Sequence, residues 1–143
     1  MLLSSARAEV HLPAGFTLEV IAGPDVLSEP MDLTFAPDGA AWVTGRAGDL
    51  WRVDAGTHAV HRIGKVDTET SGDRGLHGVA LHPDFPRTPQ VFLAYHATNH
   101  ATNQYRSRIA RWTVDGPGSA PTLKAGSEKP LLEWEGDLAG QHV

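Results

Sequence analysis

Short apolar stretches separated by turn-forming residues run along the chain from its first quarter onward. Residues 16–21 alternate apolar and polar positions at first and carry β-formers, which predicts a strand bounded by glycine turns. Leu33, Thr34 and Phe35 then lead into Pro37-Asp38-Gly39, a turn signal, before the next apolar stretch at 41–44. Further stretches at 50–53 and 60–63 follow glycine-containing turns. The pattern predicts a meander of four short strands that is complete by about residue 66.

The same pattern then starts again. Pro-Asp pairs begin at Pro37 and Pro83, 46 residues apart, and each stands between a first and a second apolar stretch. A repeat of 40 to 50 residues with four strands per unit is typical of a β-propeller blade. No apolar period of 3.6 residues persists for 12 residues, which excludes long amphipathic helices. The second unit's expected strands are 78–81, 91–95, 108–114 and 131–134, with polar surface loops at 97–107 and 116–129.

These units predict an all-β fold made of four-stranded antiparallel blades. We place one blade at about residues 30–66 and another at 75–135, within an incomplete propeller spanning 12–143. Two blades do not close a ring, so the chain is expected to be part of a larger propeller whose third blade starts at His142. Residues 1–11 are either a disordered start or the remnant of an export signal, because Ala6-Arg7-Ala8 has the small-residue pattern that precedes cleavage. An export signal would place the protein in the periplasm or outside the cell.

Composition changes this picture at a few points only. The chain has 143 residues, with 15 Gly and 10 Pro, as a fold rich in turns requires. A formal net charge of -5 argues against nucleic acid as a partner. The absence of cysteine excludes disulfides and cysteine-based metal or nucleophile chemistry. Apolar runs are far shorter than the roughly 20 residues that span a bilayer, so no membrane span is expected.

Candidate chemistry falls on the two segments that precede a first strand. Propellers bind ligands at the central channel, which is lined by loops that connect one blade to the next. Residues 68–75 and 135–142 occupy such connections, so Asp73 and His142 are expected to approach one channel from adjacent blades. Together they could hold a cofactor or deprotonate a substrate hydroxyl. The structural alternatives are a turn in which Asp73 pairs with Arg74, and a histidine with no role beyond its position at the end of the chain.

Residues 72–85, with the sequence GDRGLHGVALHPDF, carry a specific resemblance. They resemble the Gly-x-x-Gly-Leu-Leu-Gly-x-Ala-x-His-Pro-Asp-Phe segment of the glucose/sorbosone dehydrogenase family, the soluble pyrroloquinoline-quinone (PQQ) sugar dehydrogenases. Residues 12–16, 30–39 and 107–112 resemble that family's opening blades in the same order. Known members are six-bladed propellers, so the resemblance implies that this chain corresponds to roughly the first two blades.

The resemblance implies PQQ-dependent oxidation of an aldose or related sugar. His142 occupies the position of the general base that takes the proton of the anomeric hydroxyl while hydride passes to the quinone. Asp73 and Gln141 occupy the positions implied for cofactor binding, but both depart from the family. Asp73 stands where the best-known glucose-oxidising members have Gln, and its carboxylate would repel the carboxylates of PQQ. Gln141 stands where the family often has Asp, and it supplies no charge to stabilise the imidazolium.

Further implications of the resemblance concern groups that this chain lacks. The residues that bind Ca²⁺ and the basic residues that hold PQQ lie in later blades of the family, so this segment alone is expected to be inactive. A sugar substrate and an electron acceptor are the implied partners. Two alternatives remain open: a non-catalytic propeller that binds protein or glycan, and a lactonase-like or NHL-type propeller.

The remaining histidines and the tryptophans have simpler interpretations. Neither His58 with His61 nor His96 with His100 lies on a helix that would present both rings on one face, so no metal site is predicted. His82 is expected to cap the turn at Pro83. All four tryptophans are expected to pack between blades: Trp42, Trp51, Trp112 and Trp134.

Overall fold

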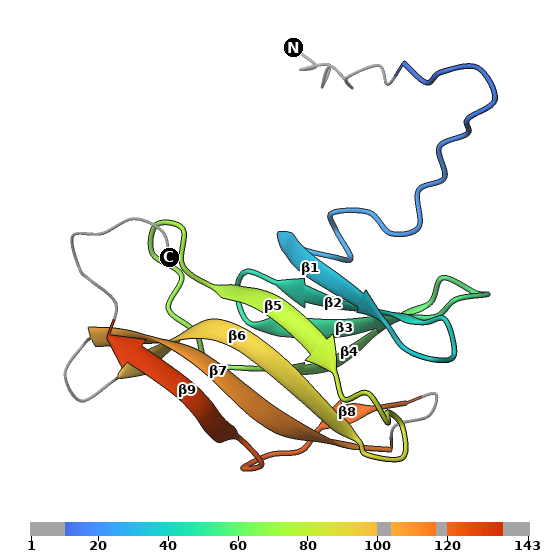
Figure 1. Cartoon of the computed structure of the whole chain (residues 1–143). Helices are drawn as coiled ribbons and strands as arrows, with labels where there is room; N and C mark the ends of the chain where they lie inside the picture. The colour runs from blue at the N-terminus through green and yellow to red at the C-terminus, as the bar shows by residue number, and fades with distance from the viewer. Residues whose placement is uncertain (1–10, 100–103, 117–119, 136–143) are drawn as a thin grey trace.

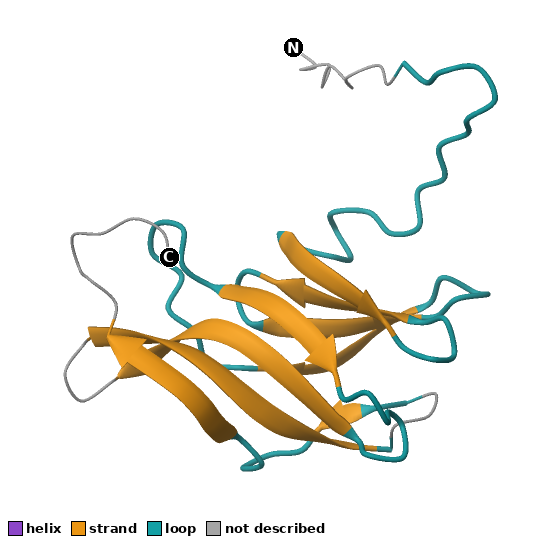
Figure 2. Cartoon of the chain, viewed as in Figure 1, coloured by secondary structure: helices purple, strands orange, loops and turns teal. Residues whose placement is uncertain are grey.

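The computed structural model describes residues 11–99, 104–116 and 120–135, and over these residues it consists of strands and loops. Figure 2 shows two antiparallel sheets and no helix in this part of the chain. The signal-like start at residues 1–8 lies outside the described residues. Among the described residues no helix is long and apolar enough to cross a membrane.

The first sheet is a four-stranded meander whose spatial order follows the chain, and the second repeats this plan with one additional strand (Figure 1). In the second sheet β5, β6, β7 and β9 lie side by side, and β8 pairs with the far end of β7. The strands are β1 (Pro30–Phe35), β2 (Ala41–Gly45), β3 (Asp49–Val53), β4 (Val60–Lys65), β5 (Leu76–Leu81), β6 (Gln90–Asn99), β7 (Gln104–Asp115), β8 (Thr122–Leu123) and β9 (Lys129–Glu135).

The Pro37-Asp38-Gly39 signal forms the predicted hairpin between β1 and β2. The N–H of Gly39 donates to the carbonyl of Ala36 at 2.9 Å, and the Asp38 carboxylate accepts the N–H of Ala40 at 3.1 Å. Gly39 has a φ of 82°, a conformation that glycine adopts without a steric penalty. The equivalent turn after β5 is closed by His82, whose Nδ1 accepts the N–H of Asp84 at 3.1 Å. The predicted cap at His82 is therefore confirmed.

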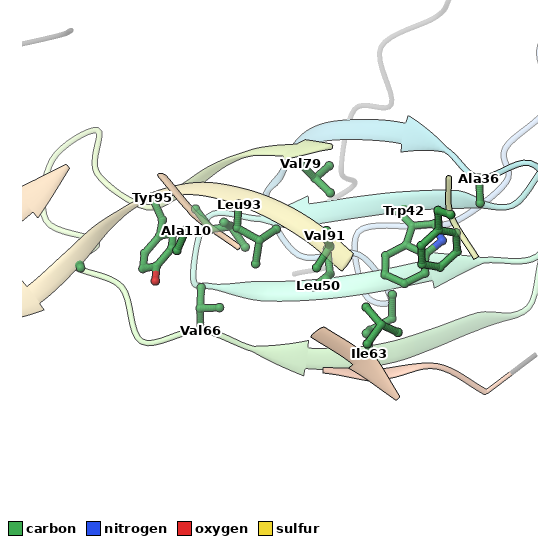
Figure 3. Packing of buried hydrophobic residues seen from close by; sticks show 14 residues of the cluster. Ala36, Trp42, Leu50, Ile63, Val66, Val79, Val91, Leu93, Tyr95 and Ala110 are labelled. Atoms are coloured by element: carbon green, nitrogen blue, oxygen red, sulfur yellow. The ribbon is translucent and has the colours of Figure 1, made fainter. Parts of the chain in front are cut away.

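The core lies between the facing sides of the two sheets (Figure 3). Trp42 and Leu50 from the first sheet and Leu93 from the second are fully buried, and Trp42 meets the ring of Phe85 edge-on at 5.4 Å. Such burial is the main source of stability in a fold whose strands are this short. The predicted interior position of Trp42 is confirmed, whereas Trp134 on β9 is 37% exposed.

Residues 16–21 do not form the predicted strand. They are an exposed loop segment that extends away from both sheets (Figure 1). Phe16 and Val20, which the alternation marks for burial, are 70% and 74% exposed. A strand needs a neighbour to accept its backbone hydrogen bonds, and no described strand lies beside this segment. The local pattern is strand-like, but the described part of the chain does not supply the pairing that would complete it.

The two polar segments of the second unit are also more regular than predicted. Residues 97–99 continue β6 and residues 104–107 belong to β7, with Ala97 paired to Arg106 and Thr98 to Tyr105. The expected loop at 97–107 is therefore mostly an extension of the hairpin. Ala97 and Tyr105 are 5% and 8% exposed, so burial of these two side chains favours the extended pairing. Within the expected loop at 116–129, β8 pairs with the end of β7.

Candidate functional site

The loop formed by residues 68–75, called the 68–75 loop below, leads from the outer strand of the first sheet into the first strand of the second. It follows β4 and ends where Leu76 begins β5, and β5 lies beside β1 (Figure 1). The sequence places Asp73 in this loop, and the structure puts it in an exposed turn directly after Gly72, whose φ is 62°. The loop and its candidate residue therefore lie where the first strands of the two sheets meet.

Arg46 holds this loop against the first sheet. Its Nη1 donates to the carbonyl of Thr70 at 2.7 Å and to that of Gly72 at 3.2 Å. Its Nε donates to a carboxylate oxygen of Glu29 at 3.1 Å, so the guanidinium charge is paired as well as hydrogen-bonded. The Arg46 carbonyl accepts the N–H of Leu76 at 3.0 Å. One residue therefore fixes both the loop and the start of β5.

Gly75 makes this close approach possible. A Cβ atom at position 75 would lie 2.5 Å from the carbonyl oxygen of Arg46, closer than a real Cβ contact allows. The second glycine of the GDRG segment is thus required by packing between the sheets. The structure supplies a physical reason for a residue that the sequence shows only as part of a motif.

Glu69 and Arg74 order the inside of the loop. The carboxylate of Glu69 accepts the N–H of Ser71 at 2.7 Å, and hydrogen bonds from Ser71 hold the pKa of Glu69 below its ordinary value. Arg74 donates from Nη1 to the Ser71 hydroxyl at 2.7 Å and to its carbonyl at 3.2 Å. The Arg74 guanidinium also lies over the ring of Tyr105, 3.9 Å from the ring centroid, an arrangement suited to cation–π attraction.

His96 on β6 holds the loop from the side of the second sheet. Its backbone N–H donates to the carbonyl of Gly75 at 3.1 Å, and its carbonyl accepts the N–H of Glu69 at 2.8 Å. The His96 ring meets the ring of His77 edge-on at 5.2 Å. Sequence reasoning did not identify Arg46 or His96 as site residues. One feature of the sequence could have pointed to this side of the loop. His77, which contacts His96, stands where the family segment has its second Leu.

The other predicted site residues, His142 and Gln141, lie outside the described residues. The structure therefore neither brings them to Asp73 nor separates them from it, and their roles stay predictions. His100 is likewise outside the described residues.

No metal centre is formed by the described residues, among which no group of three or more His, Asp or Glu side chains is arranged to hold an ion. His58 and His61 have separate acidic neighbours, Glu19 and Asp54.

The architecture of the two sheets defines the class of protein. Two antiparallel sheets of four main strands each follow one another along the chain and pack face to face, which is the arrangement of successive β-propeller blades. Residues 27–129 match the family model for glucose / sorbosone dehydrogenase. The chain belongs to this family.

Individual relatives agree with this assignment. The chain is 32% identical over 72 residues to quinoprotein glucose dehydrogenase B of Acinetobacter calcoaceticus, an alignment covering 48% of this chain and 15% of that protein. The PQQ-bound aldose sugar dehydrogenase of Streptomyces coelicolor superposes with a TM-score of 0.63 at 27% identity, covering 76% of this chain and 31% of that one. A Thermus thermophilus protein described as an oxidoreductase (glucose dehydrogenase) gives 0.63 at 25% identity, covering 81% and 32%. The chain thus spans a third or less of the length of these relatives.

Proposed function

We propose that this chain contributes part of the active site of a PQQ-dependent dehydrogenase that oxidises an aldose or related sugar. The observation that carries the proposal is the position of the GDRGLHGVALHPDF segment, which forms the end of the 68–75 loop, β5 and the turn after it in a member of this family. The proposal includes a periplasmic or extracellular location, as expected from the Ala6-Arg7-Ala8 pattern.

In this proposal His142 is the general base. Its neutral imidazole takes the proton of the anomeric hydroxyl as the C–H bond of the same carbon breaks, which leaves the sugar oxidised by two electrons. PQQ, when bound, supplies the acceptor for the hydride. Gln141 precedes the base and orients it through its amide, without the charge of the Asp found in the family. An external electron acceptor is the second partner that the proposal requires.

The described residues fit one role for Asp73 better than another. Three carboxylates, those of Glu29, Glu69 and Asp73, lie in or beside the 68–75 loop with two guanidinium groups, those of Arg46 and Arg74. The Asp73 carboxylate would repel the carboxylates of PQQ. We therefore propose that it accepts a hydrogen bond from a sugar hydroxyl and does not contact the cofactor directly. Ca²⁺ enters the proposal only through the family.

A non-catalytic binding propeller is the second candidate. It is favoured by the same two departures, Asp73 for Gln and Gln141 for Asp, because both weaken the cofactor side of the site. The two candidates differ in one measurable property, which is affinity for the quinone.

The test is a titration of the complete gene product with PQQ in the presence of Ca²⁺, followed by absorbance and by reduction of an artificial electron acceptor with aldoses. We expect saturable quinone binding and sugar-dependent turnover. His142→Ala should bind PQQ and lose turnover, whereas His61→Ala, on the exposed outer strand β4, should keep both. Absence of quinone binding would overturn the proposed dehydrogenase activity and favour the non-catalytic binding propeller.

A further inference from the structure

His96 makes four hydrogen bonds to the 68–75 loop, and one of them uses its side chain. Besides the two backbone bonds to Gly75 and Glu69, its carbonyl accepts the Thr68 hydroxyl at 2.9 Å. The fourth bond runs from the N–H of Gly75 to Nδ1 of the His96 ring, at 3.3 Å. Gly75 therefore depends on His96 for partners on both its N–H and its carbonyl.

The side-chain bond requires a particular state of the imidazole. An Nδ1 that accepts a hydrogen bond carries no proton, so the ring is neutral with its proton on Nε2. Protonation would place a second N–H on the ring, facing the N–H of Gly75, and the bond would be lost. The arrangement thus links the charge of His96 to the conformation of the residue that enters β5.

The surroundings of the ring favour this neutral state. His77 from β5 meets it at 5.2 Å and Tyr105 from β7 at 5.6 Å between ring centroids. Burial, followed by the neighbouring His77, lowers the pKa of His96 below its ordinary value. From the loop, the backbone hydrogen bond with Gly75 and the Glu69 carboxylate act in the opposite direction, and the Arg74 charge acts in the same direction as burial. The remaining titratable group of the loop is Asp73.

His77 is the neighbour that distinguishes this chain from the family segment, in which this position is Leu. Its Nε2 is buried and has no hydrogen-bond partner among the described residues. A second imidazole beside His96 makes a charge on the His96 ring more costly than a Leu would, because like charges repel each other. His77 therefore strengthens the preference of His96 for its neutral state.

We propose that His96 is a positioning residue, whose neutral ring fixes Gly75 and so holds the 68–75 loop with Asp73 in place. When His96 is protonated, the hydrogen bond at the Gly75 N–H is lost while the backbone bonds of His96 and the Arg46 contacts remain, so the loop that carries Asp73 is loosened at Gly75. The effect on catalysis rests on the proposed function, whereas the effect on the loop does not.

The first test is nuclear magnetic resonance of the full chain between pH 5 and 8, without cofactor. We expect the ring nitrogens of His96 to report the Nε2–H tautomer at pH 8. The hydrogen-exchange protection factor of the Gly75 amide should fall about five- to tenfold as His96 is protonated, the effect of one hydrogen bond. A protection factor that is constant through the titration of His96 would overturn the proposal.

Two variants separate positioning from a general structural role. His96→Asn offers an amide oxygen near the place of Nδ1 but does not titrate, so the protection of Gly75 should be kept and should no longer depend on pH. His96→Ala should lose the protection at every pH. His61→Asn serves as the control, since His61 bonds to Asp54 in the first sheet. A pH dependence that survives in His96→Asn would contradict the mechanism, even if His96→Ala failed to fold.

The catalytic arm uses the complete gene product with PQQ. If both proposals hold, His96→Asn removes the contribution of His96 to the acid limb of kcat/KM, keeps the limb set by His142, and leaves the rate at pH 8 close to that of the parent protein. A parent protein that shows normal turnover but no change in Gly75 protection between pH 5 and 8 would reject only the role of His96. Normal loop behaviour with no quinone binding would reject only the proposed enzyme.

Discussion

The carboxylate of Asp32 in β1 accepts a hydrogen bond from the backbone N–H of Val79 in β5, with a distance of 3.1 Å. The other oxygen of the same carboxylate accepts the N–H of Leu33 at 2.8 Å. One side chain therefore ties the first strand of one sheet to the first strand of the next. The link lies in the strand that carries LHGVAL, so the relative position of the two sheets and that of the candidate loop depend on the same contact.

Replacing Asp32 with Ala should lower the free energy of unfolding by about 1–3 kcal/mol, because the N–H of the buried residue Val79 loses its acceptor. Asp32→Asn is the matched control, since its single amide oxygen can still accept one of the two hydrogen bonds. Urea denaturation followed by tryptophan fluorescence measures the difference. Equal stabilities for the two variants would show that the link between β1 and β5 contributes nothing.

Gly75→Ala tests whether close packing fixes the start of β5. The new Cβ would lie 2.5 Å from the Arg46 carbonyl oxygen, so the loop or the carbonyl must move and the hydrogen bond from Leu76 is disturbed. We expect a loss of about 1–3 kcal/mol, typical of overpacking. A Cβ at Gly56 would meet no atom within 4 Å, so Gly56→Ala should stay within about 0.5 kcal/mol of the parent. Thermal unfolding of the two variants, side by side, gives the comparison.

Trp42→Ala should cost about 3–5 kcal/mol, because the side chain is fully buried between the sheets against Phe85. Trp134 is the matched control, since it is 37% exposed on the outermost strand of the second sheet. Trp134→Ala should change the denaturation midpoint of this chain much less. Similar losses at both positions would mean that the core of this chain is not the one between its two sheets.

The fold could be predicted from the sequence where a local turn signal lies between two strands that pair with each other. Pro37-Asp38-Gly39 closes the hairpin that its turn chemistry predicts, and the first sheet follows. The pattern of apolar and polar residues failed where the structure of a segment depends on whether another strand lies beside it. Residues 16–21 alternate like a strand but have no neighbouring strand among the described residues, while β8 has only two residues and is defined by its contact with β7. The length of the β6–β7 hairpin depends on burial of Ala97 and Tyr105, which local polarity does not show.

The candidate site was likewise predicted only in part from the sequence. The motif located the 68–75 loop and Asp73, because turn residues next to a first strand are visible in sequence. Arg46 and His96 were not visible as its anchors. Their contacts with Gly72 and Gly75 join residues more than 20 positions apart, and most of them involve backbone carbonyls that any residue could supply. Only the folded chain brings these groups together.

Acid should weaken the loop through Glu69 as well as through His96. Hydrogen bonds from Ser71 hold the pKa of Glu69 below its ordinary 4.5, so the folded protein binds this proton less readily than the unfolded chain does. The resulting stability is fully present above about pH 4.5 and is lost as the pH falls through the lower folded pKa.

Glu69→Gln keeps an acceptor for the N–H of Ser71 and removes the titration. Its melting temperature should therefore decline less steeply between about pH 5 and 3 than that of the parent. Asp25→Asn, at an exposed position in the N-terminal segment, should follow the parent curve. Parallel curves for the parent and Glu69→Gln would show that this carboxylate does not support the loop.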